Sequence, residues 1–196
     1  TDQNSGYDQT RADFDFDRGS NLAATRINSS GLIEKGRENL LVQSNAFDTT
    51  WTNTSSTESS GFEGYDGTNN AWKIDITATY GQIIQGVSVS GVNCASLYVK
   101  AGTLGFVRLR FDASPNAIVD FDLSDGSTAY TSGIVDASSE SIGNGWYRVS
   151  MVSNVTSSTF RIYPLIGSND LTGSTGSIYI QSAQLEKGLI ATDYIA

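Results

Sequence analysis

The chain is 196 residues long and carries 12 Lys and Arg residues against 21 Asp and Glu residues, which gives a net charge of −9. This acid excess argues against the neutralisation of nucleic-acid phosphates and against adsorption to anionic membranes, so we expect neither a nucleic-acid partner nor a membrane partner. Histidine is absent, which removes the commonest general base and the commonest transition-metal ligand, and the single cysteine, Cys94, has no partner for an internal disulfide.

Residues 1–38 differ in pattern from the rest of the chain. They contain Asp-Phe-Asp-Phe-Asp-Arg-Gly at 13–19 and few consecutive apolar residues, which makes them poor material for an independent core. We therefore predict an extended N-terminal arm or attachment segment over residues 1–38. A local hairpin around residues 28–31 is the alternative.

From residue 39 onward, short strand-like runs are separated by turn signals. Residues 39–43 form the first predicted strand, and the strongest runs lie at 145–154, 158–166 and 176–186. A helical period of 3.6 residues is not visible in this part of the sequence. The pattern predicts that residues 39–196 form an all-β domain, a jelly-roll β-sandwich of about eight to ten antiparallel strands.

The strand-like runs sort their side chains into two sets. Side chains alternate across a strand, so one set forms a core and the other a single outward face. The core set comprises Leu97, Val99, Val107, Leu109, Phe111, Val149, Phe160, Ile162, Ile178 and Ile180. The outward set, which also includes Gln181, is the predicted ligand-binding face and comprises Tyr98, Lys100, Phe106, Arg108, Arg110, Trp146, Arg148, Arg161, Tyr163 and Tyr179.

This outward face combines aromatic rings with five of the chain's 12 Lys and Arg residues. Aromatic rings stack on the apolar faces of sugars, while cationic and amide groups bind hydroxyl or carboxylate groups, so the face suits a glycan and favours an anionic one. In one alternative, the N-terminal arm or a neighbouring protein covers the face. In another, Asp112, Asp120 or Asp122 pairs with the arginines and neutralises them.

Two loops hold further candidate sites. Residues 66–70, Asp-Gly-Thr-Asn-Asn, offer oxygen ligands, so a structural calcium ion (Ca2+) at Asp66 and Asn69 is one expectation and an ordinary Asp-Gly turn is the other. Trp51, Phe62 and Tyr65 form either a second binding site at the edge of the sandwich or a plug that closes its core. The sequence has no nucleophile elbow, phosphate-binding loop or zinc-ligand spacing, so we expect no enzymatic activity and no cofactor other than this calcium.

An ordered set of short strings resembles a module of tailed-phage virion proteins. The strings are Ala-Thr-Arg-Ile-Asn-Ser-Ser-Gly-Leu-Ile-Glu at 24–34, Arg-Glu-Asn-Leu-Leu-Val-Gln-Ser-Asn-Ala-Phe at 37–47 with Trp51, Val-Lys-Ala-Gly at 99–102, Gly-Asn-Gly-Trp-Tyr-Arg-Val-Ser at 143–150, Gln-Leu-Glu-Lys-Gly at 184–188 and Thr-Asp-Tyr-Ile at 192–195. Their order is similar to that in the carbohydrate-binding-module-like β-sandwich domain of tail fibres, tail spikes and head fibres.

The resemblance implies a non-catalytic sandwich displayed on the surface of a virion. We therefore expect a fibre or decoration protein that adsorbs a bacteriophage to host or environmental polysaccharide. Residues 1–38 would attach it to other virion proteins, as a homo-oligomer on the particle. The alternative is a purely structural decoration or cement protein of the capsid or tail, in which the aromatic and Arg face contacts other virion subunits.

Overall fold

The computed structural model describes residues 25–27, 33–35, 37–172 and 175–195. The chain divides into two units, Thr1–Gly36 and Arg37–Ala196. In the first unit, β1 (Thr25–Ile27) pairs antiparallel with β2 (Ile33–Lys35), as the hairpin alternative predicts. The turn at 28–31 lies outside the described residues, and the attachment role of residues 1–38 stays a prediction.

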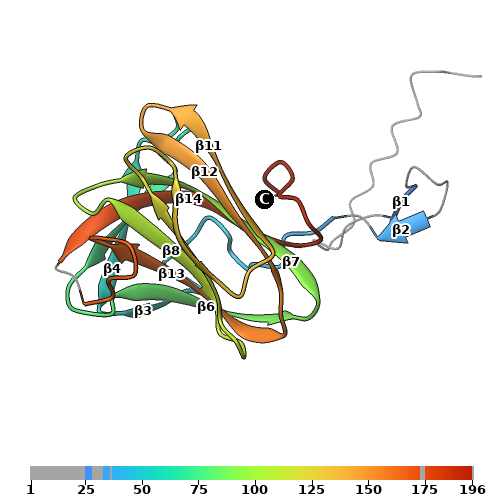
Figure 1. The fold of residues 1–196 in the computed structure, drawn as a ribbon. Coiled ribbons are helices and arrows are strands. Elements are labelled where there is room, and N and C mark those ends of the chain that lie inside the picture. Colours follow the sequence, from blue (N-terminus) through green and yellow to red (C-terminus); the bar gives the residue numbers. More distant parts are fainter. Residues whose placement is uncertain (1–24, 28–32, 36, 173–174, 196) are drawn as a thin grey trace, which may run out of the picture. The chain divides into compact units, whose positions relative to one another are not determined.

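The second unit is a β-sandwich of two antiparallel six-stranded sheets (Figure 1). Sheet I has the strand order β10-β9-β8-β13-β6-β3 and sheet II has the order β11-β12-β7-β14-β5-β4. The strands are β3 (Thr52–Thr54), β4 (Ser56–Phe62), β5 (Ala71–Ile76), β6 (Gln82–Val89), β7 (Val92–Ala101), β8 (Phe106–Phe111), β9 (Ala117–Asp122), β10 (Thr128–Ser132), β11 (Asp136–Gly143), β12 (Trp146–Asn154), β13 (Ser157–Leu165) and β14 (Gly176–Lys187). Within the described ranges there is no helix that is long and apolar enough to cross a membrane.

Consecutive strands repeatedly change sheets, which is the jelly-roll arrangement. The chain passes from β5 in sheet II to β6 in sheet I, then to β7 in sheet II and β8 in sheet I. The last two strands are inserted centrally, because β13 pairs with β6 and β8, and β14 pairs with β5 and β7. The predicted all-β sandwich is confirmed, with twelve strands in its two sheets instead of about eight to ten.

The prediction of a first strand at residues 39–43 is wrong. The chain turns at residues 42–43, and among the described residues only one backbone hydrogen bond joins this segment to β14, from the N–H of Leu40 to the carbonyl oxygen of Leu185 at 2.7 Å, so the Asn39 side chain makes further contacts there. Asn39 Oδ1 accepts hydrogen bonds from the backbone N–H groups of Leu41 at 3.1 Å and Leu185 at 3.0 Å. Asn39 Nδ2 donates to the carbonyl oxygens of Ala183 and Ile195, both at 3.1 Å, so this side chain joins the start of the sandwich to its end.

The core lies between the two sheets and contains the whole predicted core set. Each of those ten side chains has an exposed fraction of 0%. Trp51 belongs to the same cluster, and its ring centroid lies 5.1 Å from that of Phe47 and 6.4 Å from that of Phe160. The plug interpretation of Trp51 is therefore confirmed.

Candidate functional site

The predicted single outward face is divided between the two sheets. Strands β7, β12 and β14 of sheet II carry Tyr98, Lys100, Trp146, Arg148 and Tyr179, whereas β8 and β13 of sheet I carry Phe106, Arg108, Arg110, Arg161 and Tyr163. The outer faces of two packed sheets point in opposite directions, so the prediction of one continuous face is wrong. Alternation along a strand separates inside from outside, but it does not say which sheet the strand joins.

On sheet I, Arg108 is buried in a paired arrangement. Its Nε donates to Asp120 Oδ1 at 2.6 Å and its Nη2 donates to Asp120 Oδ2 at 2.9 Å, and the two side chains are 2% and 0% exposed. Asn169 covers the pair: its Oδ1 accepts from Arg108 Nη2 at 2.9 Å, and its backbone N–H donates to Asp120 Oδ2 at 2.7 Å. The expectation that Arg108 is exposed is therefore wrong, because a carboxylate on the neighbouring strand and a loop enclose it.

Arg110 and Arg161 share a second carboxylate on the same sheet. Arg110 Nε lies 2.9 Å from Asp112 Oδ1, and Arg161 Nε donates to Asp112 Oδ2 at 2.7 Å. Tyr163, opposite Arg108, is buried as well, while Phe106 is half-buried. The neutralisation alternative thus holds fully for Arg108, whereas Arg110 and Arg161 share one carboxylate, so the excess positive charge that favoured an anionic ligand is reduced on this face.

The outer face of sheet II brings the remaining predicted residues together. Lys100 on β7 lies opposite Trp146 of β12 and Tyr179 of β14, and Tyr98 lies opposite Arg148. The guanidinium carbon of Arg148 lies 5.4 Å from the centroid of the Tyr98 ring. Unlike the arginines of sheet I, Lys100 and Arg148 form no ion pair with any described residue.

A loop of residues 63–70, here called the Tyr65 loop, covers the middle of this face. The Tyr65 ring stacks on the Tyr98 ring with centroids 3.6 Å apart and planes 5° apart, and it meets Trp146 edge-on at 6.5 Å. Trp146 is therefore only 2% exposed, although it lies outside the core cluster. The prediction that the Trp146 side chain points away from the core is right. The prediction that it is exposed is wrong, because the Tyr65 loop covers it.

Gly64 and Gln181 hold the Tyr65 loop against the sheet. The backbone N–H of Tyr65 donates to Gln181 Oε1 at 3.2 Å, and Gln181 Nε2 donates to Asp66 Oδ2 at 3.2 Å. A Cβ atom on Gly64 would lie 2.0 Å from Gln181 Oε1, so any other residue here would displace the Gln181 side chain and its hydrogen bonds to the loop. Burial tends to raise the pKa of Asp66, but the hydrogen bonds from Thr68 and Gln181 outweigh it and lower that pKa below its usual value.

The Asp66 carboxylate is occupied in shaping this loop. Its Oδ1 accepts from the backbone N–H of Thr68 at 3.0 Å and from Thr68 Oγ1 at 2.7 Å, while Asn69 is exposed. Calcium requires about six to eight oxygen ligands, and the described residues contain no group of three acidic or cysteine side chains suited to a metal. The geometry fits the Asp-Gly turn alternative and not a calcium cage, and calcium binding at Asp66 and Asn69 stays a prediction.

Two hollows open on the outer face of sheet II. The first, here called the aromatic hollow, has a volume of about 310 Å³ and is lined by Phe62, Glu63, Lys100 and Tyr179. The rings of Phe62 and Tyr179 lie 5.3 Å apart and are tilted by 60° to each other. Lys100 and Tyr179 were predicted from strand parity, whereas Phe62 was predicted only as a loop aromatic.

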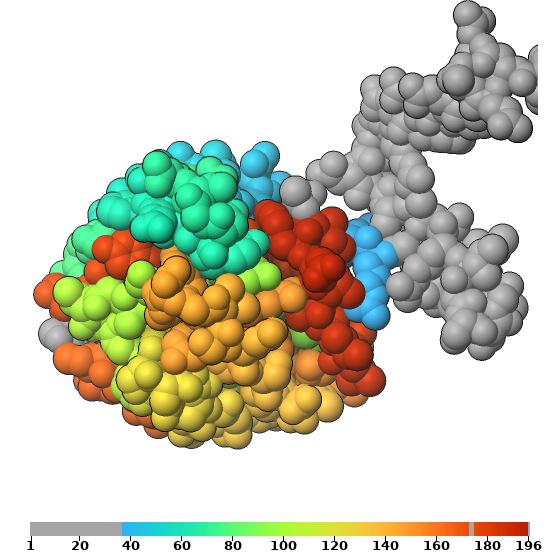
Figure 2. All heavy atoms as spheres, turned by 90° about the horizontal axis from the view of Figure 1, so that it is seen from above, coloured from blue at the N-terminus to red at the C-terminus, as the bar shows by residue number. Residues whose placement is uncertain are grey.

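The C-terminal strap, residues 188–195, lies against the same face of sheet II. Figure 2 shows the C-terminal residues (dark red) beside the segment around residues 136–150 (orange). The backbone N–H of Gly188 donates to the carbonyl oxygen of Val92 at 3.1 Å. The buried Glu186 carboxylate accepts from the backbone N–H of Thr192 at 2.9 Å and from Thr192 Oγ1 at 2.6 Å, and Arg148 Nη2 donates to the Thr192 carbonyl.

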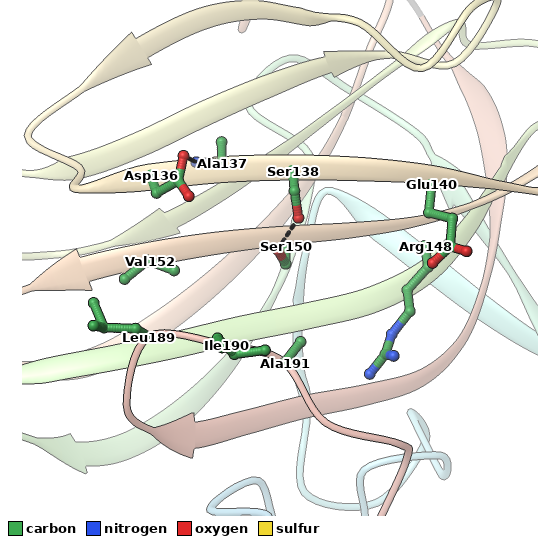
Figure 3. Close-up of a pocket in the computed structure, with 10 residues that line it drawn as sticks. All are labelled: Asp136, Ala137, Ser138, Glu140, Arg148, Ser150, Val152, Leu189, Ile190 and Ala191. Atoms are coloured by element: carbon green, nitrogen blue, oxygen red, sulfur yellow. Dashed lines mark hydrogen bonds between the residues drawn. The ribbon is translucent and has the colours of Figure 1, made fainter.

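The second hollow, here called the strap hollow, lies between this strap and strands β11 and β12. Its volume is about 240 Å³, and its lining residues are Asp136, Ala137, Ser138, Glu140, Arg148, Ser150, Val152, Leu189, Ile190 and Ala191 (Figure 3). Arg148 extends toward the strap, and the hydroxyl oxygens of Ser138 and Ser150 lie 2.7 Å apart. Of these residues, sequence reasoning identified only Arg148, because β11 was not predicted as a strand.

No protein family and no curated protein matches the sequence. The solved structures that are similar in fold include the following three. The enzymatically active domain of bacteriophage CBA120 tailspike protein 4 aligns with 75% of this chain at 14% identity and a TM-score of 0.42, and this chain spans 21% of that one. A CBM29-2 mutant, a family 29 carbohydrate-binding module in complex with cellulohexaose, aligns with 77% of this chain and 89% of its own at 12% identity and a TM-score of 0.43. TmCBM61 in complex with β-1,4-galactotriose aligns with 77% of this chain and 99% of its own at 12% identity and a TM-score of 0.40. The likeness is one of fold.

Proposed function

We propose that this chain is a non-catalytic glycan-binding module whose polysaccharide ligand binds at the aromatic hollow of sheet II. The observation that carries the proposal is the composition of this hollow. Two aromatic rings, Phe62 and Tyr179, line it beside the Lys100 ammonium, which has no ion pair with a described residue. Rings of this kind stack on sugar faces, while ammonium and carboxylate groups bind the hydroxyls, and Glu63 supplies the carboxylate.

The proposed setting is the surface of a phage virion, in a fibre or decoration protein. The strings between residues 24 and 195 that resemble the phage virion module support this setting. In this proposal, residues 1–38 bind other virion proteins, and the chain forms a homo-oligomer on the particle.

The positions of the carboxylates support a non-catalytic role. Asp136 and Glu140 both line the strap hollow and are four residues apart on β11. At about 3.3 Å per residue their Cα atoms are roughly 13 Å apart, so both side chains would have to lean toward each other to reach the separation of about 5–9.5 Å between the two carboxyl groups of a glycosidase. Asp120, another candidate acid, is buried in its pair with Arg108.

A glycan array probed with the intact chain tests this proposal. The array holds neutral, uronate-containing and sulfated polysaccharides, and it is run with and without calcium. We expect Tyr179→Ala to weaken polysaccharide binding strongly, and Phe106→Ala, a matched change of a half-buried aromatic residue on sheet I, to leave it unchanged. Silence of the whole array, or equal loss in both variants, would contradict a binding site at the aromatic hollow.

A second candidate function is that of a decoration or cement protein, and one observation favours it. Leu189 and Ile190 of the C-terminal strap are 62% and 65% exposed, and adjacent exposed apolar side chains favour a protein partner. An experiment on virus particles that lack this protein would distinguish the two functions. A cement protein would be needed for capsid or tail stability, whereas an adsorption module would be needed only for attachment to the glycan.

A further inference from the structure

The guanidinium group of Arg148, a lining residue of the strap hollow, has a nitrogen that the described residues leave without a hydrogen-bond partner. Arg148 Nη2 donates to the Thr192 carbonyl, which fixes the guanidinium group in the wall of the hollow. Arg148 Nε is buried and has no hydrogen-bond partner among the residues that the structure describes. A buried polar atom without a partner is unfavourable, so Arg148 would gain from a ligand acceptor in the hollow that a small turn of the guanidinium group brings within reach.

Acceptors line the hollow beside Arg148. Glu140 lies directly opposite Arg148 across the β11–β12 pair, and both side chains line the hollow. Figure 3 shows the Arg148 guanidinium directed toward the strap and the Glu140 carboxylate on the neighbouring strand. Asp136 adds a second carboxylate, and Ser138 and Ser150 add a hydroxyl pair on the floor between them.

This combination of groups selects the chemical class of the ligand. A sugar hydroxyl both donates and accepts, so neighbouring hydroxyls satisfy a carboxylate and a guanidinium at once. Two carboxylates and one guanidinium leave the hollow with a net negative charge, which disfavours uronates, sialates and sulfated sugars. The volume of about 240 Å³ is below the range for drug-sized ligands, which favours a single sugar ring or a chain end.

We propose that the strap hollow is a second subsite that binds a neutral sugar residue through adjacent free hydroxyls, with Arg148 as donor and Glu140 as acceptor. This inference rests on the proposed glycan-binding function and adds to it a substrate class and a location. Tyr98 lies between the two hollows. Lys100, which lines the aromatic hollow, is two residues away from Tyr98 on β7, and Arg148, which lines the strap hollow, lies opposite Tyr98 on β12. The two hollows therefore border the same aromatic stack of Tyr65 and Tyr98.

Backbone amide NMR spectra of the isotope-labelled full chain test the proposal. The probes are the methyl glycosides of glucose, galactose and mannose, with methyl glucuronide as the acidic counterpart. We expect at least one neutral glycoside to shift the amides of residues 136–140, 148–152 and 189–191, and the glucuronide to bind more weakly. In Glu140→Ala, which removes an exposed acceptor, the affinity should fall by about tenfold or more.

Two control variants separate this inference from the proposed function. Asp48→Ala removes an exposed carboxylate outside both hollows, and Tyr179→Ala disables the aromatic hollow; both should retain the shifts at the strap hollow. Array binding that depends on Tyr179, with no shift at the strap hollow for any probe, would overturn the second subsite alone. A tighter complex with the glucuronide, or an affinity unchanged in Glu140→Ala, would overturn the assignment of its chemistry. Shifts confined to Leu189 and Ile190 that appear only with a protein partner would assign the strap to protein contact and overturn the subsite.

Discussion

Replacing Arg108 by Ala should destabilise the sandwich strongly. The change removes three hydrogen bonds that Arg108 donates and leaves the Asp120 carboxylate at 0% exposure, with the backbone N–H of Asn169 as its remaining donor among the bonds described above. Breaking a buried ion pair on one side costs about 3–5 kcal/mol of unfolding free energy, because the other charge stays buried. For a domain of this size this corresponds to a fall in melting temperature of roughly 6–20 °C.

Arg110→Ala is the matched control on the same strand. Arg110 is about a quarter exposed, and its partner Asp112 keeps Arg161, so the expected loss is only about 0–1 kcal/mol. Urea and thermal unfolding, followed by far-ultraviolet circular dichroism, measure both variants. If Arg108→Ala lost no more stability than Arg110→Ala, the account of the buried pair would be refuted.

The double variant Arg108→Met with Asp120→Leu identifies the cause of the loss. Replacing both charges by apolar groups removes the uncompensated carboxylate, and such exchanges are often neutral or stabilising. We therefore expect the double variant to be more stable than Arg108→Ala. A double variant as unstable as the single one would show that lost packing, and not a stranded charge, causes the effect.

Two further predictions concern the coverings of sheet II. Burial, with the charge of Glu186, raises the pKa of the Cys94 thiol to about 11, so the native thiol should react very slowly with a disulfide reagent. The variant Thr192→Ala removes a hydrogen bond that holds the strap and should speed this reaction measurably. The control variant Thr131→Ala, which changes an exposed residue, should leave the rate unchanged. Folding lowers the pKa of Asp66 below its usual value of 3.8. The ionised Asp66 carboxylate therefore stabilises the loop fully above pH 3.8, and this stabilisation is lost as the pH falls through the lower pKa of the folded state. The near-ultraviolet dichroism of the wild type should therefore change in that acid range, and an identical acid transition in Asp66→Ala would contradict this role.

Local alternation was sufficient to predict the core. Val107, Leu109 and Phe111 alternate with charged or polar neighbours on β8, and all three are fully buried, because pleating alone decides which side chains point inward. The same reasoning applied to β12, β13 and β14, where apolar side chains alternate in the same way. The class of fold followed from these runs and the turns between them.

The arrangement of the candidate site depended on contacts between residues that are distant in sequence. Asp120 neutralises Arg108 only because β9 pairs with β8 in one particular register. Trp146 is buried because Tyr65, eighty-one residues earlier, is placed over it through Gly64 and Gln181. The pattern within a single strand contains no information on such pairings. It therefore predicted correctly that the Arg108 and Trp146 side chains point away from the core, but it predicted incorrectly that they are exposed.

Strand β11 shows a different limit. Its sequence, Asp-Ala-Ser-Ser-Glu-Ser-Ile-Gly, is polar on both faces, and most of its side chains are exposed. Its inward face carries Ala137 and Ser139, which are half-buried, so small and polar residues stand where a large apolar residue would signal a strand. One wall of the strap hollow was therefore invisible before the structure, including Glu140, the residue on which its proposed sugar specificity depends.

The hydrogen bond from Asn39 Nδ2 to the carbonyl of Ile195 makes the sandwich almost a closed ring. Asn39 and Ile195 are therefore neighbours in space, so a short linker between these two positions would allow the sandwich to be opened at an exposed turn instead, as in a circular permutant. For the same reason the sandwich can be inserted into a surface loop of another polypeptide as readily as it can be joined to an end.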